Sequence, residues 1–502
     1  MAEKSIIIIG AGMGGLASGI YGRMNGYRTR IFEMHSKPGG QCASWQRKGY
    51  TFDACIHHLF GCHASSEIYK LWNDLGAMPA ELVAIPECVS VLSEDRRIFR
   101  DYYDLSKLEE HLQGLSPGDR KATAEYIRGI RAFAGRDRWG ELIMGDGDFF
   151  SMLLATLPVF RLLKPTMAEF GGRFKDGFLR KAMPLLVYSD PTAPLMIHLI
   201  RHAYGYKGSL QWRVGGAREF ASSIERRYRD LGGEIHYRSR VEKILVENDR
   251  AIGIRLADGT EDRSDIVISN ADGRKTIIEM LENRYSDRRI ASYCADPPDE
   301  TNWAVHVFLG VNRDLSREPS SMVMLLDEPV VIANHTHGSL EMQMYGFDRT
   351  MAPAGKGVIK VELVSGYSYW KNLHADRQRY VEEKEKVADK VIDILEWRYF
   401  TGLRSQIEVI DVPTAVTWER YMGGTHGFAN MPNKKISFLR TIFGNRQEMT
   451  LPGLSNFYMA GVWVTSAGAL FMNALSGRKV IEAICRGDNK KCIGTRENPM
   501  AS

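Results

Sequence analysis

The first 33 residues carry the pattern that most constrains the fold of this chain. Ile6 to Ile9 form a β-branched apolar run that is typical of a central parallel strand buried on both faces. A glycine-rich turn follows, which permits close backbone approach to a pyrophosphate at a helix N-terminus; its glycines are Gly10, Gly12, Gly14 and Gly15. Glu33 ends the next strand, where a carboxylate accepts hydrogen bonds from both ribose hydroxyls and repels a 2′-phosphate. The pattern predicts a dinucleotide-binding βαβ unit.

A second glycine pair, Gly39-Gly40, follows Glu33 closely and lets the backbone pass near an extended cofactor. FAD-binding oxidoreductases of the glutathione-reductase superclass carry such a pair at this point, and NAD dehydrogenases generally lack it. This resemblance implies that the dinucleotide is FAD.

Later segments extend the resemblance over nearly the whole chain. They are the helix opening at 215–220, the strand entry at 232–235, the segment 240–244, the strand end at 267–271, the run 456–461 and the helix 473–478. Together they resemble the carotenoid desaturase, carotenoid isomerase and retinol saturase family of FAD enzymes. In that resemblance Val241 lies beside the adenine, and the turn after Gly461, with Gly468 and Asn473, approaches the flavin pyrophosphate and ring.

The chain departs from the family pattern in the turn that faces the flavin. The family usually has an acid or glutamine after the glycine at 461, and this chain has Val462. It also usually has a proline and more glycines where this chain has Ser466, Ala467, Ala469 and Phe471. The turn is therefore bulkier here, and we expect it to retain FAD, but the family pattern does not fix the substrate as a carotene.

Length and composition predict two domains. A chain of 502 residues with 44% hydrophobic content is too long for a single core to be the usual solution. The flavin signatures place an FAD-binding Rossmann-like domain in residues 1–95, 205–290 and 450–502. The intervening residues 96–204 and 291–449 then form a discontinuous α+β substrate domain, so the predicted class is α/β.

Periodicity predicts the main elements of that second domain. Expected helices are 104–112, 121–134, 167–186 and 376–398, and expected strands are 301–311, 330–334, 340–345, 358–364 and 406–417. A sheet with helices over it would enclose a substrate chamber above the flavin.

Charge and cysteine content exclude several classes of protein. A net charge of +5 and a pI near 8.6 are mild for this length and do not indicate nucleic-acid binding. Met1 to Lys4 lead directly into the first strand, which predicts no cleaved targeting peptide. Seven cysteines without CxxC pairs fit a reducing compartment. We expect a cytoplasmic protein, and any membrane contact would be peripheral at the inner face.

The stretch 149–164 is the most hydrophobic one outside the flavin blocks, and four basic residues follow it between 173 and 181. Apolar bulk beside a cationic cluster suits a helix that lies on a membrane surface and takes up a lipid. The alternative interpretation is that this stretch caps the core of the substrate domain. The sequence leaves both interpretations open.

The segment Cys55 to His63 contains thiols and imidazoles, which are preferred zinc ligands. No second Cys/His pair lies at the spacing of a structural zinc site, so we predict no metal. The resemblance places this loop near the flavin, where His57 or His58 could tune the flavin charge or donate a proton. The competing interpretation is a structural histidine.

The segment 418–428 matches the family's segment before the last flavin block and is expected to line the chamber. Tyr421, His426 and Phe428 are candidates for substrate contact, because aromatic walls suit a long apolar ligand. Glu419 and Arg420 are expected to pair with each other at the surface. Tyr421 and His426 are also candidates for a catalytic role.

These features predict an FAD-dependent oxidoreductase that desaturates, saturates or isomerises C=C bonds of an isoprenoid or similar lipid. Only one dinucleotide fold is visible, so electrons would pass to or from an external donor or acceptor. A flavin amine oxidase shares the cofactor fold and remains an alternative. A Rab GDI-like prenyl-binding module without flavin chemistry is the other alternative, and the complete glycine set argues against it.

Overall fold

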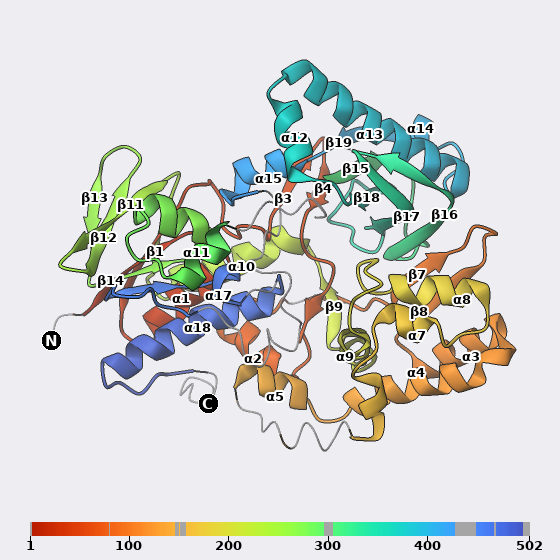
Figure 1. Cartoon of the computed structure of the whole chain (residues 1–502), viewed down its shortest axis with the longest axis horizontal. Coiled ribbons are helices and arrows are strands. Elements are labelled where there is room, and N and C mark those ends of the chain that lie inside the picture. Colours follow the sequence, from red (N-terminus) through yellow and green to blue (C-terminus); the bar gives the residue numbers. More distant parts are fainter. Residues whose placement is uncertain are drawn as a thin grey trace.

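The computed structural model describes residues 3–79, 81–145, 150, 157–295, 305–426, 448–465 and 468–494. Two sheets organise the chain, a parallel one and a mixed one (Figure 1). In Figure 1 the labels of the parallel sheet, β1 and β14, lie near the N-terminus, and those of the mixed sheet lie across the molecule beneath α12 and α13.

The first sheet is parallel, has five strands, and is assembled from three separated parts of the chain. Its order is β10 (Glu234–Tyr237), β2 (Arg28–Glu33), β1 (Ser5–Ile9), β14 (Ile266–Ser269) and β20 (Phe457–Met459). Helix α1 is the crossover between β1 and β2, as parallel pairing requires, whereas long segments of the chain separate the other neighbours. This arrangement confirms the predicted α/β class with a Rossmann-like dinucleotide-binding domain.

Both faces of this sheet are covered. Ile6 and Ile8 pack into the core beneath α1 (Met13–Met24), α10 (Gly216–Asp230) and α18 (Leu470–Gly487). Ile7 and Ile9 point the other way, toward a three-stranded antiparallel sheet of β11 (Val241–Glu247), β12 (Arg250–Leu256) and β13 (Glu261–Arg263). Side chains alternate across a strand, so the isoleucine run is buried on both faces as predicted.

The second sheet has seven strands. Its order is β19 (Ile407–Asp411), β15 (Val305–Val311), β18 (Gly357–Leu363), β17 (His335–Met344), β16 (Ser321–Ile332), β7 (Glu87–Leu92) and β8 (Ile98–Tyr102). All neighbours are antiparallel except β16 and β7. Strand β7 lies within residues 1–95, which the sequence assigns to the FAD-binding domain, but it pairs with β16 in this second sheet. The proposed domain boundaries stay a prediction.

Helices cover this sheet on both sides. One apolar face packs against α12 (Tyr367–His374) and α13 (Arg377–Arg398). On the other side, β7, β8 and β16 pack against a helical group: α3 (Leu105–Leu115), α4 (Arg120–Phe133), α7 (Met167–Gly171), α8 (Gly177–Ala182) and α9 (Leu195–Tyr206). The remaining part of that side combines Phe308 and Val358 with buried polar residues, namely His306 on β15, Glu341 and Gln343 on β17, and Lys360 and Glu362 on β18.

Shorter elements connect these layers. They are β3 (Ser44–Arg47), β4 (Tyr50–Asp53), β5 (Leu59–Phe60), α2 (Glu67–Asp74), β6 (Leu82–Val83), η1 (Pro117–Asp119), α5 (Arg138–Met144), η2 (Leu157–Leu162), η3 (Met183–Leu185), β9 (Leu210–Arg213), η4 (Lys275–Met280), α11 (Arg288–Ala295), α14 (Leu403–Gln406), α15 (Ala415–Met422) and α17 (Val462–Thr465).

Three predicted elements are wrong in extent. The strand expected over 330–334 is the end of β16 followed by the hairpin turn at Ala333 and Asn334, whose positive φ values of 49° and 61° suit a two-residue turn. The helix expected over 167–186 is divided into α7, α8 and η3, because a new helix starts where the Asp176 side chain accepts a hydrogen bond from the Leu179 amide. The strand expected over 406–417 ends at Asp411. Pro413 has no amide hydrogen to donate, and Thr414 caps α15 instead.

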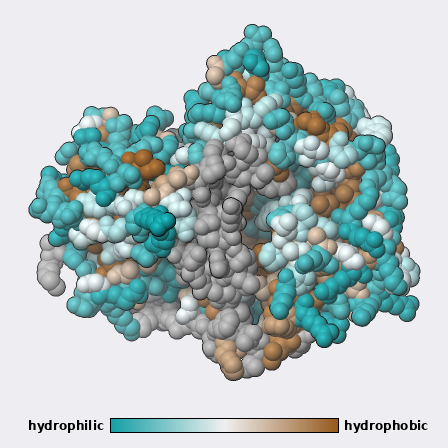
Figure 2. All heavy atoms as spheres, viewed as in Figure 1, coloured by the Kyte–Doolittle hydropathy of each residue, from teal (hydrophilic) through white to brown (hydrophobic). Residues whose placement is uncertain are grey.

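The stretch 149–164 is only partly described. Phe149 and residues 151–156 lie outside the described residues, whereas Phe150, Leu157 and Phe160 are 63%, 56% and 46% exposed. Figure 2 shows apolar side chains gathered at the lower edge of the molecule, near the segment that joins α5 to α7. In the described part of the chain, no helix combines the length and apolar character that crossing a membrane requires.

Candidate functional site

The glycine turn between β1 and α1 leaves no room for side chains. A Cβ on Gly15 would lie 2.0 Å from the Gly10 carbonyl oxygen, and a Cβ on Gly14 would lie 2.4 Å from Oδ1 of Asn270. Gly12 is the N-cap residue of α1 and has no side chain, so the first amides of the helix receive no capping hydrogen bond from it. Uncapped amides at a helix N-terminus favour a phosphate there.

The Gly39-Gly40 pair lies directly against this turn. The Gly39 amide donates to the Ala11 carbonyl oxygen at 2.9 Å, and both glycines have positive φ, at 113° and 58°. A Cβ on Gly39 would lie 2.3 Å from the Cys42 carbonyl oxygen, and one on Gly40 would lie 3.3 Å from the Gly12 Cα. Only glycine meets both conditions, so the pair forms a second backbone wall beside the turn.

Glu33 is buried at the end of β2. Its Oε2 accepts a hydrogen bond from the Ala11 amide at 2.7 Å, and its Oε1 accepts one from the His35 amide at 2.8 Å. A carboxylate oxygen accepts more than one hydrogen bond, so each oxygen keeps capacity for a ribose hydroxyl. The two backbone amides also hold the carboxylate in a fixed orientation.

A cavity of about 1620 Å³ opens along these groups. Pockets for small molecules usually measure about 300–1,000 Å³, so this one has space for an extended dinucleotide and more. Its lining includes ten residues from the predicted cofactor set, namely Gly10, Gly12, Gly14, Glu33, Gly39, Gly40, Val241, Gly461, Gly468 and Asn473. Gly15 lies behind the turn, packed on the Gly10 carbonyl.

The C-terminal turn is attached to the glycine turn through Asn270. A Cβ on Gly461 would lie 2.4 Å from Asn270 Oδ1, and the Gly461 amide donates to Ser476 Oγ at 2.8 Å. Asn473 accepts a hydrogen bond from Thr465 Oγ1 at 3.0 Å. Asn270 was not among the predicted site residues, although its place at the carboxyl end of a central parallel strand was a signal for it.

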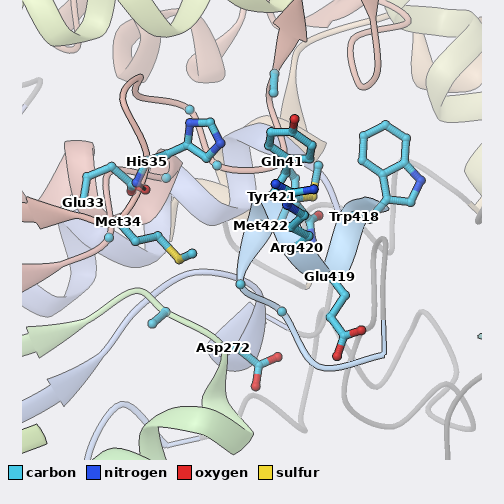
Figure 3. Close-up of a pocket in the computed structure, with 18 of the residues that line it drawn as sticks. Glu33, Met34, His35, Gln41, Asp272, Trp418, Glu419, Arg420, Tyr421 and Met422 are labelled. Carbon is cyan, nitrogen blue, oxygen red and sulfur yellow. Dashed lines mark hydrogen bonds between the residues drawn. The ribbon is translucent and has the colours of Figure 1, made fainter. Parts of the chain in front are cut away.

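Helix α15 borders the same cavity. Figure 3 shows Trp418 to Met422 beside the segment that contains Glu33 and His35. The rings of His35 and Tyr421 lie 5.4 Å apart, and Thr425 Oγ1 donates to Asp272 Oδ1 at 2.8 Å. These contacts place Tyr421 along the dinucleotide cavity. The ring of His426 packs edge-on against Tyr367 at 5.2 Å, and Phe428 lies outside the described residues.

The predicted pairing of Glu419 with Arg420 is wrong. Glu419 accepts hydrogen bonds from Lys371 Nζ at 2.8 Å and from the Tyr367 hydroxyl at 3.1 Å. The Arg420 guanidinium lies over the Tyr421 ring instead. The sequence suggested a strand end, but the residues belong to a helix, where adjacent positions point in different directions.

Asp53 fixes the loop that carries the two candidate histidines. Its Oδ2 accepts from the Ala217 amide at 2.6 Å, at the start of α10, and its Oδ1 accepts from the amides of Cys55 and Ile56. Burial raises the pKa of Asp53, and these three amides oppose the rise. Sequence reasoning did not single out Asp53 for this role.

His57 and His58 do not line the dinucleotide cavity. His57 Nε2 lies 3.6 Å from Glu362 Oε1, and its Nδ1 contacts the Gln343 amide. Burial lowers the pKa of both imidazoles, although Glu362 opposes the shift for His57. The structure therefore groups His57 with β17 and β18, apart from Tyr421 and His426.

Comparison with known proteins agrees with this geometry. The family described as NAD(P)-binding Rossmann-like domain matches residues 8–75. Prolycopene isomerase from Daucus carota is 25% identical over 85% of this chain and 72% of its own. Lycopene-forming phytoene desaturases from Pseudescherichia vulneris and Pantoea ananas are 26% and 25% identical, over 80% and 91% of this chain and 84% and 94% of theirs.

Solved structures show the same fold at lower identity. An oxidoreductase from Methanosarcina mazei has a TM-score of 0.60 and 18% identity, covering 95% of this chain and 100% of that one. Putrescine oxidase has a TM-score of 0.57 and 13% identity, covering 97% and 99%. The fold and the glycine cradle define a dinucleotide-binding protein, and the likeness to phytoene desaturases makes it an oxidoreductase. Within that class, the resemblance of this chain to carotenoid desaturases and isomerases is confirmed.

Proposed function

We propose that this chain binds FAD non-covalently and uses it to desaturate, saturate or isomerise C=C bonds of a hydrophobic isoprenoid or similar lipid. The sequence likeness to a prolycopene isomerase and to phytoene desaturases over most of the chain carries the proposal. The glycine cradle and the carboxylate of Glu33 support the cofactor assignment, because they suit an extended dinucleotide without a 2′-phosphate.

The residues of the cavity have distinct roles in this proposal. The turn at Gly10 to Gly15 would hold the pyrophosphate, Glu33 the ribose, and Val241 the adenine, while Gly461 and Gly468 would approach the ring. When bound, FAD supplies a ring that accepts or delivers a hydride. The protein then has to position the substrate carbon and exclude water. An external electron donor or acceptor completes the reaction.

Aromatic residues provide the water-excluding wall. Trp45 and Trp418 line the cavity, and their rings lie 6.0 Å apart. Phe308 packs against Trp45 at 5.2 Å and against Phe52 at 5.0 Å. Such a wall suits an apolar chain, because it offers large contact area and few hydrogen-bonding groups.

The alternatives have weaker support. Putrescine oxidase shares the fold at 13% identity, which is a likeness of architecture alone. An amine oxidase would release peroxide in the presence of amines, and this assay separates the two enzyme classes. A prenyl-binding module without flavin chemistry would not need the complete glycine cradle that this chain retains.

We further propose that the protein contacts a membrane surface through the exposed residues Phe150, Leu157 and Phe160. Arg161 and Lys164 are exposed beside them. Apolar side chains next to cations are what a peripheral lipid contact requires. This surface would give a lipid substrate a short route from the bilayer.

The visible spectrum of the purified protein tests the cofactor assignment. We expect a yellow protein whose denatured supernatant has the absorbance and mass of FAD. A colourless protein that takes up no added FAD would overturn the proposed function. Extraction of co-purified lipid, followed by mass spectrometry, then tests the substrate class.

A further inference from the structure

Arg201 lies on α9 without an ionic partner. Among the residues that the structure describes, none is within hydrogen-bond or ion-pair distance of its guanidinium, which lies over the Tyr188 ring at 5.4 Å. The side chain is partly buried. Arginine usually binds carboxylates or phosphates with two parallel hydrogen bonds, so a guanidinium held here without a partner is available for an anionic ligand.

The loop beneath Arg201 is held in an unfavourable conformation. Tyr188 and Ser189 are consecutive non-glycine residues with positive φ, at 48° and 50°. Such residues cost free energy and persist where the surrounding structure enforces them, often beside binding sites. Here Ser189 Oγ donates to Glu341 Oε2 at 3.1 Å, and the Tyr188 ring, 47% exposed, lies edge-on to His57 at 5.7 Å. The contacts bring polar groups from several elements together.

The polar groups come from one face of the seven-stranded sheet. Side chains alternate along β17 and β18, so Leu340 and Met342 enter the core under α13, whereas Glu341 and Glu362 lie on the opposite face. Glu341 is paired with Glu362 across the two strands. Both glutamates are buried. Burial of a carboxyl group costs free energy unless polar partners compensate for it, and a pure hydrocarbon substrate would supply no such partner.

Glu341 is the carboxyl group of this cluster that interacts electrostatically with Arg201. Lys360 Nζ lies 3.0 Å from Glu362 Oε1 and balances that carboxylate. Burial and the neighbouring Glu362 raise the pKa of Glu341 to about 7, so Glu341 is partly protonated at neutral pH. The ammonium of Lys360 also argues against a metal ion between His57, Glu341 and Glu362, although their ligand atoms lie within 4.8 Å of one another.

Aromatic contacts connect this cluster with the dinucleotide cavity. Tyr204, one turn after Arg201 on α9, packs on Phe60 at 4.2 Å, and Phe60 stacks on Phe471 at 5.5 Å. Phe471 follows Leu470, which lines the cavity. These contacts link α9, which carries Arg201, to α18, whose first residue borders the dinucleotide cavity.

We propose that Arg201, with Tyr188 and the Glu341 carboxyl, binds the carboxylate at one end of a long apolar substrate. The inference rests on the proposed function and narrows its substrate class to an isoprenoid or similar chain that ends in a carboxylic acid. A single guanidinium whose neighbouring carboxyl group is partly protonated matches one negative charge. A diphosphate would carry more charge than the cluster balances, and Glu341 and Glu362 would repel it.

Binding of matched probes to the FAD-loaded protein tests this inference. The probes are geranylgeranoic acid, its methyl ester and geranylgeranyl diphosphate, and the readout is quenching of tryptophan fluorescence together with the change in flavin absorbance. We expect the acid to bind at least tenfold more tightly than the ester. Arg201→Gln should remove this preference, and Arg201→Lys should retain part of it. Arg226→Gln, which changes an exposed arginine paired with Glu219, is the control.

Equal affinity of the wild-type protein for acid and ester would overturn the inference without any variant. Tighter binding of the diphosphate would also overturn it. Retention of the acid preference in a folded Arg201→Gln protein would exclude Arg201. In each of these cases FAD content and ester binding would stay normal, whereas failure of the proposed function would show as loss of both.

Discussion

The carboxylate of Glu33 accepts a hydrogen bond from the backbone amide of Ala11 at 2.7 Å, which joins the end of β2 to the glycine turn after β1. The residue that would recognise the ribose thus also orders the turn that would hold the pyrophosphate. This double role means that a change at Glu33 affects both parts of the cofactor site.

Replacing Glu33 by alanine should weaken FAD retention. Loss of charged hydrogen bonds costs about 1.5–3 kcal/mol, which is roughly 10- to 150-fold in affinity. Titration of the apoprotein with FAD measures the effect. Glu234→Ala, an exposed carboxylate on β10, is the matched control and should leave the affinity unchanged. Unchanged FAD affinity in Glu33→Ala would remove Glu33 from the site.

Replacing Gly14 by alanine should impair both folding and FAD binding. The new methyl group would lie 2.4 Å from Asn270 Oδ1 and 2.9 Å from the Gly461 amide nitrogen. Overpacking of this kind costs about 1–3 kcal/mol. Urea unfolding and FAD content measure it. Gly114→Ala lies inside α3 with nothing within 4 Å, so it should be neutral or stabilising by about 0.5–1 kcal/mol. Equal stability of the two variants would contradict the tight cradle.

Local patterns account for what the sequence predicted well. The run Ile6 to Ile9, the glycine turn and Glu33 lie within one βαβ unit, whose geometry is nearly fixed by chain connectivity. The turn and its helix therefore have the expected form. The same local reasoning was wrong over 406–417, where Pro413 and the Thr414 cap end the strand character early.

The cluster around Arg201 depends on information that is not local. Glu341 and Glu362 face each other only because β17 and β18 pair in one register. If one strand shifted by one residue, its glutamate would point to the opposite face of the sheet. Arg201 comes to them on a helix that is distant in sequence. The sequence shows that polar and apolar residues alternate along the two strands, but it does not show which residue of β18 lies opposite Glu341.

Removing exposed apolar side chains should weaken membrane binding. Phe150 and Phe160 are 63% and 46% exposed, and each contributes about 1.5–3 kcal/mol if fully buried in lipid. The Phe150→Ser, Phe160→Ser double variant should therefore lose more than tenfold in liposome partitioning, measured by flotation, with FAD content unchanged. Trp397→Ser, at a residue that is 69% exposed on α13, is the control. If the double variant unfolds or loses FAD, these residues belong to the core.

The stability of the protein should carry a pH dependence that comes from Glu341. Its pKa is raised to about 7 in the folded chain, whereas an unfolded glutamate titrates near 4.3. Between these values the folded state binds more protons than the unfolded state, so Glu341 makes the free energy of unfolding fall as pH rises from about 4.5 to 7. His57 acts in the opposite direction, because burial lowers its pKa and the unfolded state takes up its proton below about pH 6.5.

The comparison must therefore be made between wild type and Glu341→Gln, which keeps an acceptor for Ser189. Urea unfolding at pH 5 and pH 7 should show that the variant gains stability relative to wild type at the higher pH, by about 2 kcal/mol. A difference that stays constant with pH would show that Glu341 is ionised throughout, and the cluster would then hold a negative charge that Arg201 already balances.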